Sequence, residues 1–73
     1  MTGPEMQWVD SSNVERIGYL NETKELHVQF ASGPITYIYL DVPESTFEEL
    51  MASPSKGSYL NREIKPHYHF RTE

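Results

Sequence analysis

The sequence contains no cysteine, so disulfide bonds, thiolate metal sites and a catalytic thiol are all excluded. No apolar stretch approaches the roughly 18–20 residues that a membrane-spanning helix needs. The first five residues lack the basic start and apolar run of a signal peptide. These absences predict a protein of the cytoplasm that has no membrane partner.

Seventy-three residues leave room for one small domain. The apolar fraction of 37% and the charged fraction of 23% are ordinary for a globular chain and unlike those of a disordered one. A core of this size supplies only about 3–5 kcal/mol of net stability, and no disulfide adds to it. We expect residues 1–9 to form an N-terminal tail or a short leading strand, 10–70 a single domain, and 71–73 a C-terminal tail.

The net charge of −5 is unevenly spread along the chain. Residues 1–53 carry nine acidic side chains against two basic ones, which makes −7. Residues 54–73 carry four basic side chains against two acidic ones, which makes +2. A basic end on an acidic body is one sign of a polyanionic partner. The alternative is that the scattered charge serves only solubility.

Apolar and polar residues alternate on both sides of a turn at Gly33. The alternating apolar residues are Leu26, Val28 and Phe30 before the turn, and Tyr37 and Tyr39 after it. Such a period of two predicts strands around 26–30 and 35–40, and a similar pattern predicts an earlier strand over 14–20. Short loops join the three strands, so we expect an antiparallel meander in which Gly33 supplies a positive φ.

Helical spacing replaces this alternation after Pro43. Pro43 suits the first turn of a helix, whereas Ser45 and Glu48, at capping-box spacing, offer an alternative start. The stripe predicted to face the core consists of Phe47, Leu50 and Met51. Residues 53–55 end this helix, and a second one is predicted over 56–65 because Pro66 disfavours a helical residue before it.

These segments predict an α+β fold, an antiparallel three-stranded β-meander followed by two short α-helices packed on one face. The residues expected to be buried together are Leu26, Val28, Phe30, Phe47, Leu50, Leu60 and Ile64. Because Ile38 lies between two tyrosines, both faces of its strand are partly apolar, and the sequence does not assign the face that the helices cover.

The strand pattern is followed by Ser55-Lys56-Gly57, Tyr59, Asn61, Ile64 and Tyr68. This order and spacing resembles the KTSC domain, a short module found alone in bacterial and phage proteins and at the C-terminus of some lysyl-tRNA synthetases. The resemblance extends from about residue 10 to residue 70. Because RNA binding has been suggested for that family, the resemblance implies an RNA-associated module.

Two overlapping groups of residues are candidates for binding an anion. The turn formed by Ser55, Lys56 and Gly57 precedes or opens the second helix, where free backbone N–H groups favour a phosphate or carboxylate. The alternative is an ordinary interhelix turn that Ser55 caps. The second group is a basic patch, in which Arg62 and Lys65 share a helical face because they are three residues apart. Its members are Lys56, Arg62, Lys65 and Arg71. The alternative is a solvated surface.

Four tyrosines are candidates for an aromatic surface, namely Tyr37, Tyr39, Tyr59 and Tyr68. Exposed aromatic side chains on a sheet can stack on the bases of a single strand. Tyrosines on a strand also commonly fill the margin of a core and direct the hydroxyl to a partner. The resemblance to the KTSC domain, in which both residues recur beside a buried helix, favours this structural role for Tyr37 and Tyr39.

The chain shows no catalytic constellation and no complete metal site. His67 and His69 stand two apart, as a metal-binding pair in a strand would, but no third ligand is evident nearby. The serines lie in turns and caps without a histidine–acid partner. We therefore expect a non-enzymatic binding module without metal or cofactor, and the family resemblance implies that it is associated with RNA. The alternative is a protein–protein adaptor or a phage-type inhibitor of a host protein, and the oligomeric state stays open.

Overall fold

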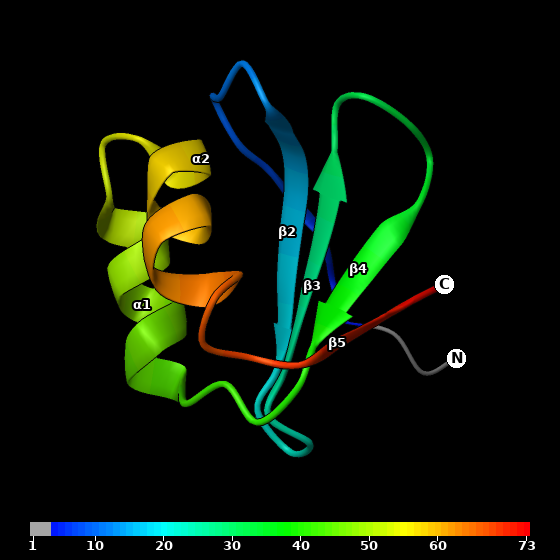
Figure 1. Cartoon of the computed structure of the whole chain (residues 1–73), viewed down its shortest axis with the longest axis vertical. Helices are drawn as coiled ribbons and strands as arrows, with labels where there is room; N and C mark the ends of the chain where they lie inside the picture. Colours follow the sequence, from blue (N-terminus) through cyan, green and yellow to red (C-terminus); the bar gives the residue numbers. More distant parts are fainter. Residues whose placement is uncertain (1–3) are drawn as a thin grey trace.

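Five antiparallel strands form one sheet in the order β1-β2-β3-β4-β5, and the helical segments lie on one side of it (Figure 1). The computed structural model describes residues 4–73. Along the chain the elements are β1 (Gln7–Trp8), β2 (Val14–Leu20), β3 (Glu25–Phe30), β4 (Thr36–Tyr39), α1 (Glu44–Ala52), α2 (Lys56–Tyr59), η1 (Leu60–Ile64) and β5 (Phe70–Thr72). The α+β class is confirmed, and the expectation of a three-stranded sheet is wrong.

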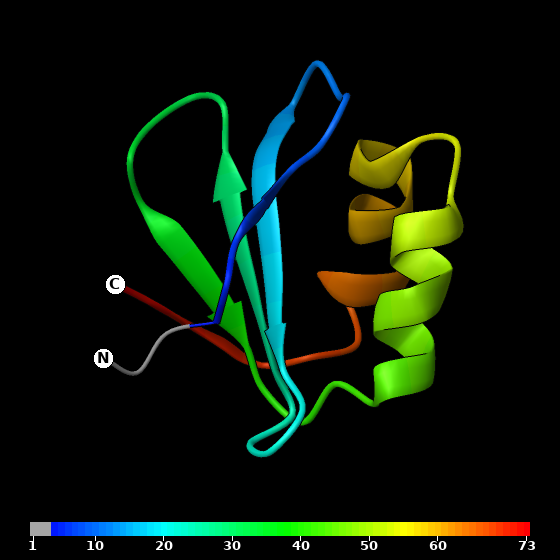
Figure 2. The same cartoon turned by 180° about the vertical axis from the view of Figure 1, so that it is seen from behind.

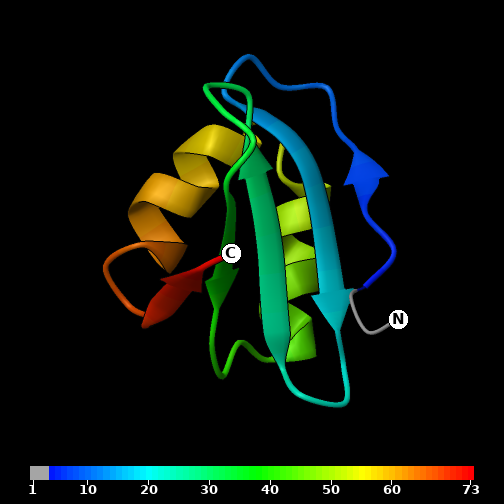
Figure 3. The ribbon, with the colours of Figure 1, turned by 90° about the vertical axis from the view of Figure 1, so that its right-hand side faces the viewer.

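The two strands beyond the predicted meander lie at opposite edges of the sheet, and the first of them is the short leading strand that was one alternative for residues 1–9 (Figure 3). Strand β1 has two residues and pairs with β2, and strand β5 has three residues and pairs with β4. Segments this short carry too few residues for an alternation to be seen, so only their pairing defines them. Residues 70–72 are therefore part of the sheet, whereas 1–3 of the expected N-terminal tail lie outside the described residues.

The inner face of the sheet carries the core. Across the strands Ile17 lies opposite Val28, and Leu26 lies opposite Tyr39. The fully buried cluster against which the helices pack is Val14, Ile17, Leu26, Val28, Tyr39, Val42, Leu50, Leu60 and Ile64. Two residues expected within the core, Phe30 and Phe47, are only half-buried and pack against its margin. Phe30 ends β3, and its position at the end of the strand leaves part of its ring uncovered.

The helical segments begin and end close to the predicted positions. Helix α1 starts at Glu44, with Pro43 immediately before it accepting hydrogen bonds from two backbone N–H groups, and it ends at Ala52. The second predicted helix is two segments, α2 and the π-helical η1, in which the N–H of Lys65 donates to the carbonyl of Leu60 at 2.8 Å. The wider turn of a π-helix rotates residues three apart farther from one another than an α-helix does.

The outer face of the sheet is covered in part by the N-terminal stretch, seen in blue beside β2 in Figure 2. A Cβ atom on Gly18 would lie 2.6 Å from the Met6 sulfur and 3.0 Å from the Glu5 carbonyl oxygen. His27 lies opposite Gly18 in the neighbouring strand and is buried, with Nε2 at 3.1 Å from the Glu25 carboxylate. The glycine thus allows residues 4–6 to lie directly on the sheet.

The expectation for Gly33 is wrong, because no glycine of the described chain has a positive φ. A Cβ atom at Gly33 would meet no atom within 4 Å. The positive φ values belong instead to Lys24, at 61°, and Asp41, at 59°. Lys24 closes the β2–β3 turn and Asp41 follows β4, so the left-handed backbone lies in two connections where the sequence shows no glycine.

Candidate functional site

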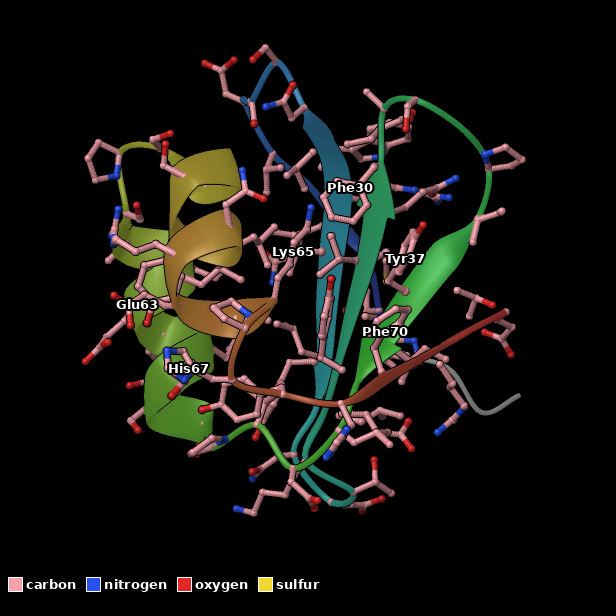
Figure 4. All side chains as sticks on the ribbon, viewed as in Figure 1. Phe30, Tyr37, Glu63, Lys65, His67 and Phe70 are labelled. Atoms are coloured by element: carbon pink, nitrogen blue, oxygen red, sulfur yellow. The ribbon has the colours of Figure 1, made fainter. Side chains whose placement is uncertain are left out.

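A groove of about 710 Å³ opens between the inner face of the sheet and the segment formed by α2 and η1. Its lining residues are Ser12, Asn13, Phe30, Ala31, Ser32, Tyr37, Tyr39, Gly57, Asn61, Lys65 and Phe70. We call this site the aromatic groove. Figure 4 shows Lys65 reaching from the helical side toward Phe30 and Tyr37 on the sheet.

The sheet side of the aromatic groove is a cluster of rings. The centroids of Phe30 and Tyr37 lie 5.4 Å apart with planes inclined by 82°, and Tyr37 lies 5.4 Å from Phe70 at 45°. Phe70 also lies 5.6 Å from Tyr39. The Phe70 side chain belongs to edge strand β5 and remains 52% exposed. The rings therefore form a cup that is open to solvent at Phe70.

One positive charge faces this cup. The Lys65 ammonium lies 5.0 Å from the centroid of the Phe30 ring, in a cation–π contact. Within residues 4–73, Lys65 has no carboxylate partner, and none of the residues that line the aromatic groove is acidic. In a chain with a net charge of −5, this makes the groove a locally positive site.

Two amide side chains add hydrogen-bonding groups to the groove, which the hydroxyls of Ser12 and Ser32 also line. Asn61 lies one helical turn before Lys65, and Asn13 comes from the segment that leads into β2. The Asn13 amide nitrogen lies only 3.3 Å from where a Cβ atom of Gly57 would be. Each amide offers two donors and one acceptor, which matches the mixed edges of a flat polar ligand. Because Gly57 has no side chain, the Asn13 amide can pack against the helix.

A second hollow of about 380 Å³ is lined by Thr46, Glu49, Tyr59, Glu63, His67 and Tyr68, and we call it the acidic pocket. The Tyr59 hydroxyl donates to the Glu49 carboxylate at 2.9 Å. Burial, together with this hydrogen bond, raises the pKa of Tyr59 to about 12. Figure 4 shows Glu63 and His67 away from the rings of the aromatic groove.

The turn that was a candidate anion site has the contacts of an interhelix turn. The Ser55 hydroxyl accepts from the backbone N–H of Ser58 at 3.4 Å, and the Lys56 ammonium donates to the carbonyl of Ser53 at 3.0 Å. Lys56 is thereby directed to the end of α1, while Gly57 lines the aromatic groove. Anion binding at this turn stays a prediction.

The structure does not gather the four predicted cations into one basic patch. Lys65 faces Phe30, whereas the Arg62 guanidinium lies 6.0 Å from the Tyr59 ring and pairs with Glu63. The π-helical turn of η1 separates the directions of these two side chains, which a regular α-helix would bring closer. Arg71 and Lys56 lie elsewhere, and Arg71 pairs with Glu25 at 3.4 Å.

The four candidate tyrosines divide between the two hollows and the core. Tyr39 is 2% exposed, so its ring belongs to the core rather than to a surface, and burial raises its pKa. Tyr37 is half-buried in the aromatic groove, whereas Tyr59 and Tyr68 line the acidic pocket. The prediction did not include Phe30 and Phe70 among the binding residues. For Phe70, the one available signal in the sequence was its spacing of two residues from Tyr68.

Comparison with known proteins identifies the family. The family model of the KTSC domain matches residues 10–68. The chain belongs to the KTSC domain family. The solved structure of a KTSC domain protein from Yersinia pestis has a TM-score of 0.91 and 34% identity to it, and the match covers 97% of this chain and 99% of that one. The predicted family resemblance is confirmed.

Two relatives differ in how much of their own length this chain matches. A protein of Tsukamurella paurometabola is 38% identical over 63 residues, which are 86% of this chain and 92% of that protein. A lysine–tRNA ligase of Nostoc punctiforme is 36% identical over 61 residues, which are 84% of this chain but 11% of the ligase. Within residues 4–73, this KTSC domain has no helix long and apolar enough to cross a membrane.

Proposed function

We propose that this KTSC domain is a non-catalytic module of the cytoplasm that binds single-stranded RNA in the aromatic groove. The observation that carries the proposal is an open cup of aromatic rings beside an ammonium group that no carboxylate of residues 4–73 neutralises. Stacking of a base on an aromatic side chain contributes about 1–3 kcal/mol, and a lysine at the same site attracts phosphate. The residues that line the groove supply contacts for binding and no carboxylate or imidazole for proton transfer.

The overall charge of the chain limits where a polyanion can approach. At −5 the protein repels RNA at long range, but at physiological ionic strength exposed charges are screened beyond about 8 Å. A site without carboxylates can therefore bind RNA locally, with an affinity that falls as salt is added. The similarity to a segment of a lysine–tRNA ligase supports an RNA partner, because that enzyme is named for one.

Fluorescence anisotropy with a labelled single-stranded RNA tests the proposal. Binding should be measurable at low salt and weaker at physiological salt. Lys65→Glu should abolish it, because the substitution places a negative charge beside the ring cup. Arg62→Glu is the matched control, since Arg62 contacts Tyr59 and Glu63 instead, and it should retain binding. Absence of binding by the unmodified protein at low salt would contradict the proposal.

A protein–protein adaptor is the second candidate, and the outer face of the sheet favours it. Trp8 in edge strand β1 is 70% exposed, and the Arg16 guanidinium lies 5.1 Å from its ring centroid. Arg16 is held in turn by the Gln29 side chain. An exposed tryptophan beside an arginine is typical of the residues that dominate protein interfaces. Capture of a partner that persists at high salt and is lost in Trp8→Ala, but not in Lys65→Glu, would favour the adaptor.

A further inference from the structure

The basic side chains of the described residues 4–73 are distributed so that one of them, Lys65, lines the aromatic groove. Arg71 pairs with Glu25. The residues on either side of Arg71 in β5 have their side chains on the inner face of the sheet, so the Arg71 side chain lies on the outer face. Arg62 pairs with Glu63, and Lys56 binds the end of α1. Lys24 precedes β3, whereas Phe30 ends it, so Lys24 lies at the far end of that strand from the groove. Arg16 is held by the Gln29 side chain. Among the described residues 4–73, a nucleic-acid strand in the groove therefore meets the ammonium of Lys65 alone.

The rings are arranged to contact a single base rather than a row of bases. Successive stacked bases need aromatic rings that present parallel faces along a path. Here the Tyr37 plane is inclined by 82° to Phe30 and by 45° to Phe70. Mutually inclined rings that touch one another offer a flat ligand one ring face and the edges of the neighbouring rings, which is enough for one base. The volume of about 710 Å³ is in the range of sites for single small ligands, roughly 300–1,000 Å³.

We infer that the aromatic groove takes one nucleotide, with its base against the cluster of Phe30, Tyr37 and Phe70 and its phosphate at the Lys65 ammonium. The amides of Asn13 and Asn61 then face the polar edges of the base and sugar. This inference rests on the proposed function and narrows it to a single nucleotide unit. The nucleotide is either free in solution or part of a single strand.

Titration of the nitrogen-15-labelled protein, followed by NMR, tests the inference with 5′-AMP, adenosine and ribose 5-phosphate. 5′-AMP should bind about tenfold or more tightly than either of the other compounds, because each retains only one of the two contacts. The shifted amides should be those of the groove, with Gly57, Asn61 and Lys65 among them. A single-stranded RNA of roughly ten nucleotides, titrated in parallel, shows whether a strand supplies the nucleotide.

Two variants separate the base contact from the phosphate contact. Lys65→Gln should reduce the affinity for 5′-AMP to about that for adenosine and leave adenosine binding unchanged, because only the phosphate needs the ammonium. Phe70→Leu should weaken 5′-AMP and adenosine alike, because the ring contacts the base. Arg62→Gln is the control cation and should change neither affinity. Preserved dispersion of the NMR spectrum shows that a variant is folded. If Phe70→Leu does not fold, the comparison of Lys65→Gln with Arg62→Gln is sufficient to test the phosphate contact.

The outcomes distinguish this inference from the function on which it rests. RNA binding without binding of 5′-AMP or adenosine would overturn the single-nucleotide site and leave RNA binding standing. Absence of binding by every compound and by the RNA would overturn both. Equal losses of 5′-AMP affinity in Lys65→Gln and Arg62→Gln, or shifts confined to Tyr59 and Glu63, would overturn the placement of the phosphate. Tighter binding of the strand than of 5′-AMP, with the same variant pattern, supports a nucleotide within RNA.

Discussion

The aromatic groove and the acidic pocket lie on two sides of the same short helical segment and carry opposite charges. Gly57, Asn61 and Lys65, spaced by four residues, line the groove. Tyr59 and Glu63, also four apart, line the acidic pocket. One hollow therefore has a lysine and no carboxylate, whereas the other has two carboxylates and no lysine or arginine among its lining residues.

This contrast shows that the net charge of a small domain says little about one site on it. The protein is acidic overall, yet its larger hollow is the one without acids. Neighbouring residues of a helix point in different directions, so two sites separated by one or two positions in sequence have different chemistry. The side chains of Leu60 and Ile64 point in a third direction, toward the core. Both are fully buried, and they hold the segment against the core.

The largest expected effect comes from removing that anchor. Leu60→Ala should lower the free energy of unfolding by about 2–5 kcal/mol, because Leu60 is fully buried and its truncation leaves a cavity. That loss is comparable with the whole stability of a domain of this size, so both hollows should disappear together. Urea unfolding measures it. A variant that unfolds with the midpoint of the parent would show that the segment is not anchored by this residue.

A smaller effect is expected at Gly18, which lies outside both hollows. Gly18→Ala should cost about 1–3 kcal/mol, because its Cβ would be 2.6 Å from the Met6 sulfur and close to the Glu5 carbonyl. Gly33→Ala is the matched control and should be neutral or stabilising by about 0.4–1 kcal/mol, since Gly33 has no positive φ and open space around it. Thermal melts measure both. Equal losses would show that the N-terminal stretch does not lie on the sheet.

The acidic pocket should be visible in the titration of Tyr59, whose pKa of about 12 exceeds the ordinary value of 10.0. A raised pKa in the folded state means that the folded protein binds the proton more tightly than the unfolded chain. The stabilisation by this group is therefore complete below pH 10 and is lost as the pH rises toward about 12. NMR of the tyrosine rings measures the pKa, and Glu49→Gln should lower it toward the ordinary value. An unchanged pKa in that variant would contradict the hydrogen bond.

The smallest effect is expected at the ion pair between Arg71 and Glu25, on the outer face. The charged atoms are 3.4 Å apart and the Arg71 side chain is 55% exposed, so Arg71→Gln should cost no more than about 1 kcal/mol. Hydrogen bonding from His27, together with Arg71, lowers the pKa of Glu25, so the stabilisation is lost as the pH falls through that lowered value. Thermal melts between neutral and acidic pH measure it. Loss of nucleotide binding in this variant would contradict the assignment of the phosphate contact to Lys65.

Sequence patterns predicted the elements that are long enough to show a period. The strand over Val14–Leu20 and the end of the first helix at Ala52 agree with the prediction, and so does the order of the elements. Edge strand β5 was not predicted, and β1 was only one of two alternatives for residues 1–9, because these strands have three and two residues. Their hydrogen bonds are to residues distant in sequence, and no local propensity specifies such a pairing.

The candidate site was predicted only in part, because it draws on separate segments. Tyr37, Gly57 and Lys65 were among the predicted binding residues and do line the aromatic groove. Phe70 and Asn13, by contrast, enter it from the last strand and from the segment before β2. No spacing rule connects residues so far apart, so the cup of rings becomes evident only when the sheet and the helical segment are packed together.

The sequence by itself determined the α+β class, the alternating apolar faces of three strands and the four-residue spacings in the segment 56–65, because all of these are local properties of the backbone. The tertiary structure alone decided which sheet face the helices cover and that Lys65 meets the rings while Arg62 does not. It also decided that Tyr39 is core and Phe70 is surface. These outcomes depend on contacts between distant segments, whose packing assigns each side chain to the interior, to a hollow or to solvent.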